Sequence, residues 1–98
     1  MTNDVTKQLE TTITQMKEEI LHDVRAGHVP RNCASFGEMH DYRDANCYGG
    51  FCDDDVADAL IEQFGGRDAD EGMPDGMINF INAAQDAIDQ WIKEGGLL

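Results

Sequence analysis

The amino-acid sequence predicts an all-α protein, a compact bundle of about four helices with a long helix at its N-terminal end. Apolar residues recur at intervals of three and four through four separate segments, which is the spacing of one face of an α-helix. No segment of any length alternates apolar and polar residues as a half-buried strand would. With 98 residues the chain has a common single-domain size, so we expect one helical domain over residues 1–98.

The first predicted helix covers residues 2–26. Its apolar residues form one stripe, made of Val5, Leu9, Ile13, Met16, Ile20 and Val24. Gly27 ends the helix, and Pro30 disfavours helical backbone in the residue before it. A helix of about 24 residues is about 36 Å long at 1.5 Å per residue, which is long for so small a domain. We therefore expect residues 1–26 to be an amphipathic helix that can serve as a homodimer interface, ahead of a helical core at residues 35–96.

Two shorter helices are expected in the middle of the chain. Ser35 and Glu38 form an S-x-x-E capping box, so a second helix should cover residues 36–46. A third should cover residues 56–64, where apolar residues again have helical spacing, and the glycine pair 65–66 should end it. Negative charge is favourable at the start of a helix because of the helix dipole. The acidic residues in that position are Asp53, Asp54 and Asp55.

The last predicted helix begins near Pro74, a residue that suits the first turn of a helix. Its apolar stripe consists of Met77, Ile81, Ala84, Ile88 and Trp91, widened by Phe80 and Ile92. Lys93 lies in its last turn, and the glycine pair 95–96 ends it. The four predicted helices leave only short connections between them, which suits a bundle.

The charge of the chain is strongly negative, with a formal net value of −13. Between residues 38 and 75, twelve acidic side chains against two arginines leave a local charge of −10. Such a field repels nucleic acid and anionic membranes, which are bound through Lys and Arg. We therefore expect no direct contact with either, and a cation or a basic protein as the partner. The alternative is that the acidity only keeps the protein in solution.

The sequence also indicates a cytoplasmic protein with reduced thiols. No segment has the roughly 18 apolar residues of a membrane span, and the N-terminus is polar where a secretory signal is hydrophobic. The three cysteines, Cys33, Cys47 and Cys52, are an odd number in a chain without an export signal. We therefore expect all three to be free.

The segment DANCYGGFCDDD, residues 44–55, can be aligned with an EF-hand calcium loop. The residues at its ligand and turn positions are Asp44, Asn46, Gly49, Gly50 and Asp55. However, Tyr48 and Cys52 occupy two further ligand positions and offer no suitable oxygen. A calcium-binding module is therefore the alternative, and an acid-capped turn between helices is the simpler interpretation.

Zinc binding and catalysis have less support in the sequence. Four residues could supply zinc ligands, namely Cys33, His40, Cys47 and Cys52, but they lack the two close pairs of a zinc module. The histidines, His22, His28 and His40, fall on or beside the first two helices. No P-loop, dinucleotide fingerprint or pair of carboxylates with separated pKa values is recognisable. We expect no enzyme, no metal and no cofactor.

A third interpretation makes the middle segment a protein-binding face, in which aromatic residues are ringed by acids. Spaced carboxylates on helices can also imitate the phosphates of a nucleic acid. The predicted partner-binding residues are Asp41, Tyr42, Asp44, Tyr48, Phe51, Asp53, Asp54, Asp55 and Asp58. For Tyr48 and Phe51, the alternative is that each folds inward to complete the core.

The runs SFGEMHDYRDANCYGGFCDDDVADAL and GGRDADEGMPDGMINFINAAQDAIDQW resemble small acidic proteins of proteobacterial plasmids, integrative elements and phages. The resemblance covers about residues 30–92 and depends mainly on residues 36–50 and 65–77. It implies a mobile-element setting and no particular activity. Small acidic proteins of such elements are often inhibitors of host defence, including anti-CRISPR and anti-restriction proteins. We therefore expect a non-enzymatic interaction protein that binds a basic, nucleic-acid-handling host protein, with a calcium module or a structural helical dimer as alternatives.

Overall fold

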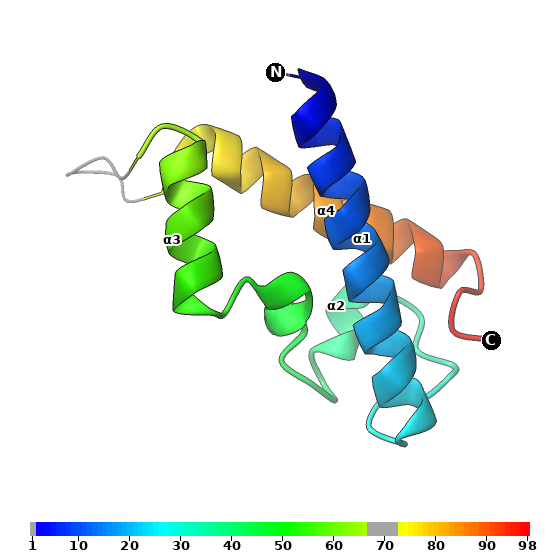
Figure 1. Ribbon diagram of the computed structural model, residues 1–98. Coiled ribbons are helices and arrows are strands. Elements are labelled where there is room, and N and C mark those ends of the chain that lie inside the picture. Colours follow the sequence, from blue (N-terminus) through cyan, green and yellow to red (C-terminus); the bar gives the residue numbers. More distant parts are fainter. Residues whose placement is uncertain (1, 67–72) are drawn as a thin grey trace.

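The computed structural model describes residues 2–66 and 73–98, and these residues form helices without any strand. The elements are α1 (Thr2–Arg25), α2 (Phe36–Met39), the 3₁₀ helix η1 (Ala45–Gly50), α3 (Asp54–Gln63) and α4 (Asp75–Lys93). Figure 1 shows α1 crossing α4, with α2 and η1 beside the crossing and α3 at one end of the molecule. The predicted all-α fold with a long N-terminal helix is confirmed. Among the described helices, none has the length and apolar character needed to cross a membrane.

The main core lies where α1 crosses α4. Its buried residues are Met16, Ile20, Val24, Val29, Cys33, Phe36, Met39, Ala45, Tyr48, Ala84, Ile88, Ile92 and Leu97. Trp91 of α4 packs against this core half-buried, and Lys17 Nζ of α1 lies 5.6 Å from the centroid of its ring. The predicted stripe of α1 is therefore largely used inside the chain, while its pairing with a second copy stays a prediction.

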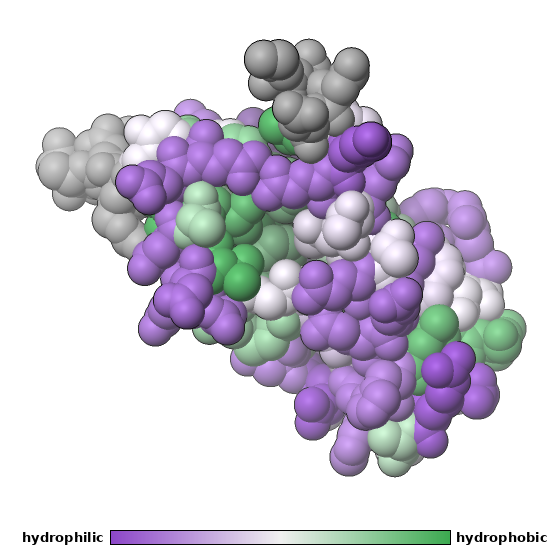
Figure 2. Space-filling model, viewed as in Figure 1, coloured by the Kyte–Doolittle hydropathy of each residue, from purple (hydrophilic) through white to green (hydrophobic). Residues whose placement is uncertain are grey.

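A second and smaller core joins α3 to the start of α4. Its buried residues are Leu60, Ile61, Met77 and Phe80. Two half-buried side chains, Leu9 of α1 and Phe51, pack against both cores. On the face shown in Figure 2, hydrophilic side chains predominate, and apolar side chains remain visible between α3 and α1.

The second predicted helix is much shorter than expected. Ser35 Oγ accepts a hydrogen bond from the Glu38 N–H at 3.0 Å, as a capping box requires, but Glu38 reaches Ala34 N–H instead of Ser35. The helix ends at Met39, and the chain bends so that Ala45 and Tyr48 enter the main core. A helix of four residues is marginal without packing. Burial of the residues that follow it therefore determines the conformation of this segment.

The third and fourth helices begin close to the residues where the sequence predicts them. The Asp53 carboxylate accepts hydrogen bonds from the N–H groups of Asp55 and Val56, at 2.9 and 3.4 Å, and thereby caps α3. Pro74 is the N-cap of α4 and not a residue of its first turn. Near the end of α4, Lys93 Nζ lies 2.8 Å from a carboxylate oxygen of Asp89. Local sequence signals therefore place both helices correctly.

Replacing Gly49 by alanine should destabilise the fold more than the same change at Gly27. Both glycines have positive φ, 86° and 83°, so alanine strains the backbone at either site by about 1 kcal/mol. A Cβ at Gly27 would meet nothing within 4 Å, whereas one at Gly49 would lie 3.0 Å from Cγ of the buried Met16. Because of this crowding, Gly49→Ala should lower the free energy of unfolding by about 1 kcal/mol more than Gly27→Ala, measured by urea denaturation. Equal losses would show that Met16 moves aside freely.

Candidate functional site

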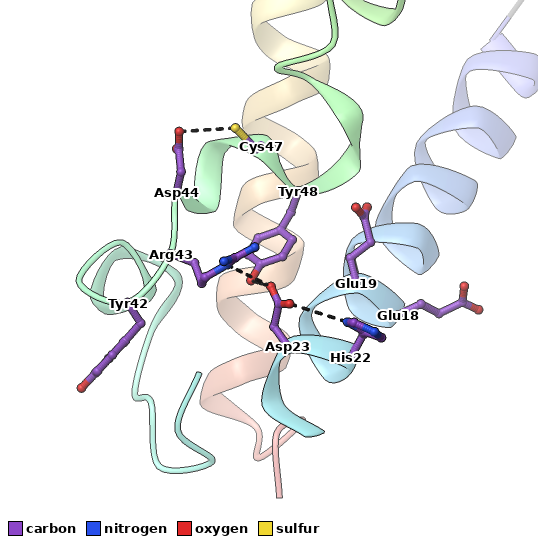
Figure 3. A pocket seen from close by; sticks show the side chains of 9 residues that line it. All are labelled: Glu18, Glu19, His22, Asp23, Tyr42, Arg43, Asp44, Cys47 and Tyr48. Carbon is purple, nitrogen blue, oxygen red and sulfur yellow. Dashed lines mark hydrogen bonds and ion pairs between the residues drawn. The ribbon is translucent and has the colours of Figure 1, made fainter. Parts of the chain in front are cut away.

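A cleft with a volume of about 810 Å³ lies between the C-terminal half of α1 and the segment 42–48 (Figure 3). The residues that line it are Glu18, Glu19, His22, Asp23, Tyr42, Arg43, Asp44, Cys47 and Tyr48. Four of these nine side chains are carboxylates and one is an arginine. The cleft therefore presents a mainly negative wall beside the exposed ring of Tyr42.

A buried carboxylate, Asp23, holds the base of this cleft together. The Tyr48 hydroxyl donates a hydrogen bond of 2.5 Å to Asp23 Oδ2, and Arg43 Nε lies 3.4 Å from the same oxygen. His22 Nδ1 lies 3.7 Å from Oδ1. Only 7% of Asp23 is exposed, so these contacts compensate a charge that has left water. Together they fix residues 43–48 against α1.

The environment sets the protonation states of this pair. Burial alone would raise the pKa of Asp23, but the hydrogen bond from Tyr48 and the charge of Arg43 outweigh it and hold the pKa below its ordinary value. Burial and the neighbouring Asp23 carboxylate raise the pKa of Tyr48. At neutral pH, Asp23 is therefore a carboxylate and Tyr48 a neutral phenol, which is the combination that a strong structural hydrogen bond needs.

The expectation that all three cysteines are free is wrong for two of them. Cys47 and Cys52 form a disulfide, with their Cα atoms 4.9 Å apart. The left-handed conformations of the glycines at positions 49 and 50 turn the chain back and bring the two cysteines together. Cys33 remains free and buried; burial raises the pKa of its thiol, which donates to the Ser35 carbonyl at 3.4 Å.

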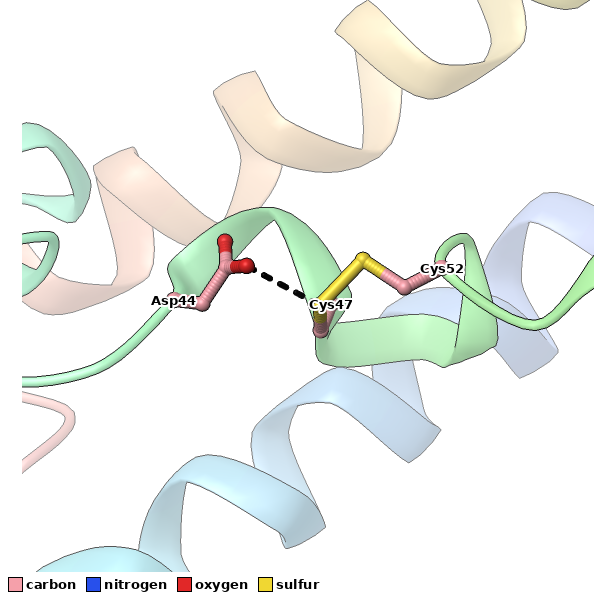
Figure 4. Close-up of side chains that lie close together, drawn as sticks. All are labelled: Asp44, Cys47 and Cys52. Carbon is pink, nitrogen blue, oxygen red and sulfur yellow. Dashed lines mark hydrogen bonds between the residues drawn. A yellow bond between two sulfur atoms is a disulfide. The ribbon is translucent and has the colours of Figure 1, made fainter.

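Asp44 lies directly beside this disulfide (Figure 4). One of its carboxylate oxygens and the two Sγ atoms all lie within 4.8 Å of one another, and Oδ2 is 3.3 Å from Cys47 Sγ. A disulfide sulfur carries no hydrogen, so this contact becomes a hydrogen bond only when Cys47 is a thiol. Cys52 directly precedes Asp53, the N-cap of α3, so the disulfide ties η1 to the start of that helix.

Most of the predicted partner-binding residues lie on the surface. The exposed ones are Asp41, Tyr42, Asp44, Asp53, Asp54, Asp55 and Asp58. Phe51 is half-buried between the two cores. Tyr48 does not lie on the exposed face, because its ring belongs to the main core and its hydroxyl is bonded to Asp23.

The residues aligned with a calcium loop, and the four candidate zinc ligands, lie in surroundings that differ from those of an EF-hand loop or a zinc module. In the segment aligned with a calcium loop, Asn46 Oδ1 accepts a hydrogen bond from Gln85 Nε2 of α4, and Asp55 lies in the first turn of α3. A 3₁₀ helix and a disulfide shape the segment, so calcium binding stays a prediction. Of the four candidate zinc ligands, Cys33 is in the main core and His40 stands edge-on to Phe36, apart from the disulfide. The group that the structure does bring together, within the described residues, is Asp44, Cys47 and Cys52.

Two features of the site are missing from the sequence-based expectations. The Asp23–Tyr48–Arg43 network was not predicted because its members are up to 25 positions apart in the sequence. A signal exists, since Asp23 lies three positions after Ile20 and so falls on the apolar stripe of α1. The second feature is the disulfide, whose signal is the glycine pair between the two cysteines.

Comparison with protein-family models gives no match for this chain, and searches of curated proteins and of solved structures give none either.

Proposed function

We propose that this protein is a non-enzymatic acidic interaction protein that binds a basic surface of a partner protein through its middle segment. The observation that carries the proposal is the net negative charge of residues 41–62, whose acidic side chains are exposed. The exposed acidic side chains there are Asp41, Asp44, Asp53, Asp54, Asp55, Asp58 and Glu62. The one cation of the segment, Arg43, is paired with the buried Asp23 and does little to offset them.

The disulfide concentrates this charge. It holds an Asp44 carboxylate oxygen within 4.8 Å of Cys52 Sγ, and Cys52 directly precedes Asp53, the N-cap of α3, although eight residues separate Asp44 from Asp53 in the sequence. Tyr42, which is 47% exposed, and Val56, which is 37% exposed, add apolar contact area to the segment. A charged surface with a few aromatic or apolar anchors can combine fast, electrostatically guided association with specificity.

The partner class follows from the same charges. Basic clefts that normally hold nucleic-acid phosphates present Lys and Arg at a spacing that carboxylates on a rigid scaffold can satisfy. A nucleic-acid mimic of this kind would compete with DNA or RNA for the cleft. Given the resemblance to mobile-element proteins, we propose that the partner is a nucleic-acid-handling host protein in the cytoplasm, such as a component of a CRISPR or restriction defence complex.

Neutralising acids of the proposed face should weaken partner binding, while neutralising the same number of acids elsewhere should not. The face variant is Asp41→Asn/Asp54→Asn/Asp55→Asn, and the control of equal charge change is Glu10→Gln/Asp86→Asn/Glu94→Gln, whose sites are all exposed. Wild type, immobilised and exposed to a proteobacterial lysate at low salt, should retain a basic protein that DNA or high salt releases. Three lost charge pairs of about 0.5 kcal/mol each predict roughly tenfold weaker binding by the face variant.

The control variant decides whether the face or the total charge matters. It should retain the partner as wild type does, and circular dichroism should show both variants folded. Equal loss of binding by the two variants would mean that only net charge attracts the partner. A lysate that yields no salt-sensitive basic protein would count against the proposal itself.

A further inference from the structure

We propose that Asp44, Cys47 and Cys52 form a zinc site that exists only when the Cys47–Cys52 disulfide is reduced. This site goes beyond the proposed partner binding, because its ligand is a metal ion and it can be tested without any partner.

The distances between the three side chains suit one ion. Zinc ligands at about 2.3 Å for sulfur and 2.1 Å for oxygen are about 3.6 Å apart in a tetrahedral arrangement. Asp44 Oδ2 is already 3.3 Å from Cys47 Sγ, and all three ligand atoms lie within 4.8 Å of one another. Once the S–S bond is broken, the two sulfurs need to separate to only about 3.8 Å. Small side-chain rotations can therefore place all three around a Zn²⁺ ion.

The donor set selects the kind of metal. Two thiolates favour zinc and related ions over calcium and magnesium, which prefer oxygen ligands. Four residues separate the cysteines, which is within the spacing found in zinc sites, and Asp44 adds a third ligand from the preceding turn. Two thiolates and a carboxylate bind Zn²⁺ with a net charge of −1, leaving one coordination position for water.

Access and charge favour the same ion. Cys52 and Asp44 are exposed and Cys47 is half-buried, so both a reductant and a metal ion can reach the group. The neighbouring Asp53 and Asp54 are exposed acids whose field attracts cations. A disulfide buried in the core would lack this access to solvent and these neighbouring negative charges.

The chemistry of the switch balances with a dithiol reductant. The reductant gives two electrons and two protons to the Cys47–Cys52 disulfide, which becomes two thiols while the reductant becomes a disulfide. Zinc then binds the two thiolates and releases the two thiol protons. Where thiols are kept reduced the dithiol form predominates, and oxidation of the pair to the disulfide would expel the ion.

Zinc titration of the reduced and oxidised protein tests the site. The disulfide is reduced with a phosphine, which takes up the oxygen of one water as two thiols form and supplies no thiol of its own. Calorimetry should then show one Zn²⁺ bound per chain by the reduced protein and none at comparable concentration by the oxidised protein. With Co²⁺ as a probe, the reduced protein should also show a thiolate-to-metal charge-transfer band.

Matched variants identify the ligands. Cys47→Ser/Cys52→Ser should lose binding, while Cys33→Ser, which removes the remaining thiol, should bind as wild type does. Asp44→Asn should bind Zn²⁺ at least about tenfold more weakly, because losing a ligand should reduce metal affinity no less than losing a residue that only supports a ligand. The control variant Asp41→Asn should bind Zn²⁺ as wild type does. Equal binding by the oxidised protein or by the double cysteine variant would overturn the site. So would an unchanged affinity in Asp44→Asn, or one zinc ion shared by two chains.

Discussion

Ile88→Ala should lower the free energy of unfolding by about 2–5 kcal/mol, whereas Ile78→Ala should lower it by less than about 1 kcal/mol. Both isoleucines lie on α4, so the two changes alter helix propensity equally. Ile88 is fully buried in the main core, while Ile78 is 37% exposed. The difference therefore measures the packing of α4 against α1.

Urea denaturation of the two variants provides the measurement, with thermal unfolding as a second one. For a chain of this size, each kcal/mol should shift the melting temperature by about 4–8 °C. Equal losses at the two positions would contradict the packing of Ile88 between the helices. A loss at Ile88 of about 1 kcal/mol would mean that the main core collapses around the smaller side chain.

The hydrogen bond between Tyr48 and Asp23 should be the strongest polar contribution to stability. Tyr48→Phe removes a 2.5 Å hydrogen bond to a buried carboxylate and should lower the free energy of unfolding by about 2–3 kcal/mol at pH 7. Tyr42→Phe makes the same chemical change at a ring that is 47% exposed, and its effect should stay within about 0.5 kcal/mol. Comparable effects of the two variants would show that the Asp23 carboxylate finds other donors.

The same pair should also make stability depend on pH at the acid end. Because the native pKa of Asp23 lies below its ordinary value of 3.8, the unfolded chain binds more protons in this range and stability rises with pH. The contribution of Asp23 is complete above that value and is lost as the pH falls through the native pKa. The difference in unfolding free energy between wild type and Asp23→Asn should thus shrink as the pH falls below about pH 4.

A second carboxylate serves as the internal comparison for this pH dependence. Hydrogen bonds from Lys93 and from the Phe36 N–H also lower the pKa of Asp89, so it contributes a slope of the same sign. Asp89 is present in both wild type and Asp23→Asn, and its effect cancels in their difference. A difference that persists unchanged to pH 3 would contradict an ionised, hydrogen-bonded Asp23.

The three long helices were predictable because the signals that define them are local. Apolar spacing and caps lie within a few positions of each other, and the Asp53 cap of α3 is in the predicted place. The second helix was predicted too long for the opposite reason. This helix ends early because Ala45 and Tyr48 are buried against α1 and α4, and the residues near its end do not indicate that packing.

In the candidate site, only the exposed positions of the acidic residues could be predicted from the sequence. The acids of residues 41–58 were expected on the surface and lie there, since charged side chains resist burial. Tyr48 can satisfy its hydroxyl inside the protein, so its inward position depended on a distant Asp23. The disulfide likewise depended on the backbone turn between Cys47 and Cys52, which residue counting does not reveal.

The two cores differ in how easily the parts of the molecule that they anchor can open. Among the described residues the small core buries only four, and α3, which carries many of the exposed acids, is anchored there. Segments with little buried surface open at a lower free energy than the rest of a protein, as separate cooperative units. The acidic end around α3 should thus open at a lower free energy than the crossing of α1 and α4, and the half-buried Leu9 and Phe51 connect the two parts because they pack against both cores.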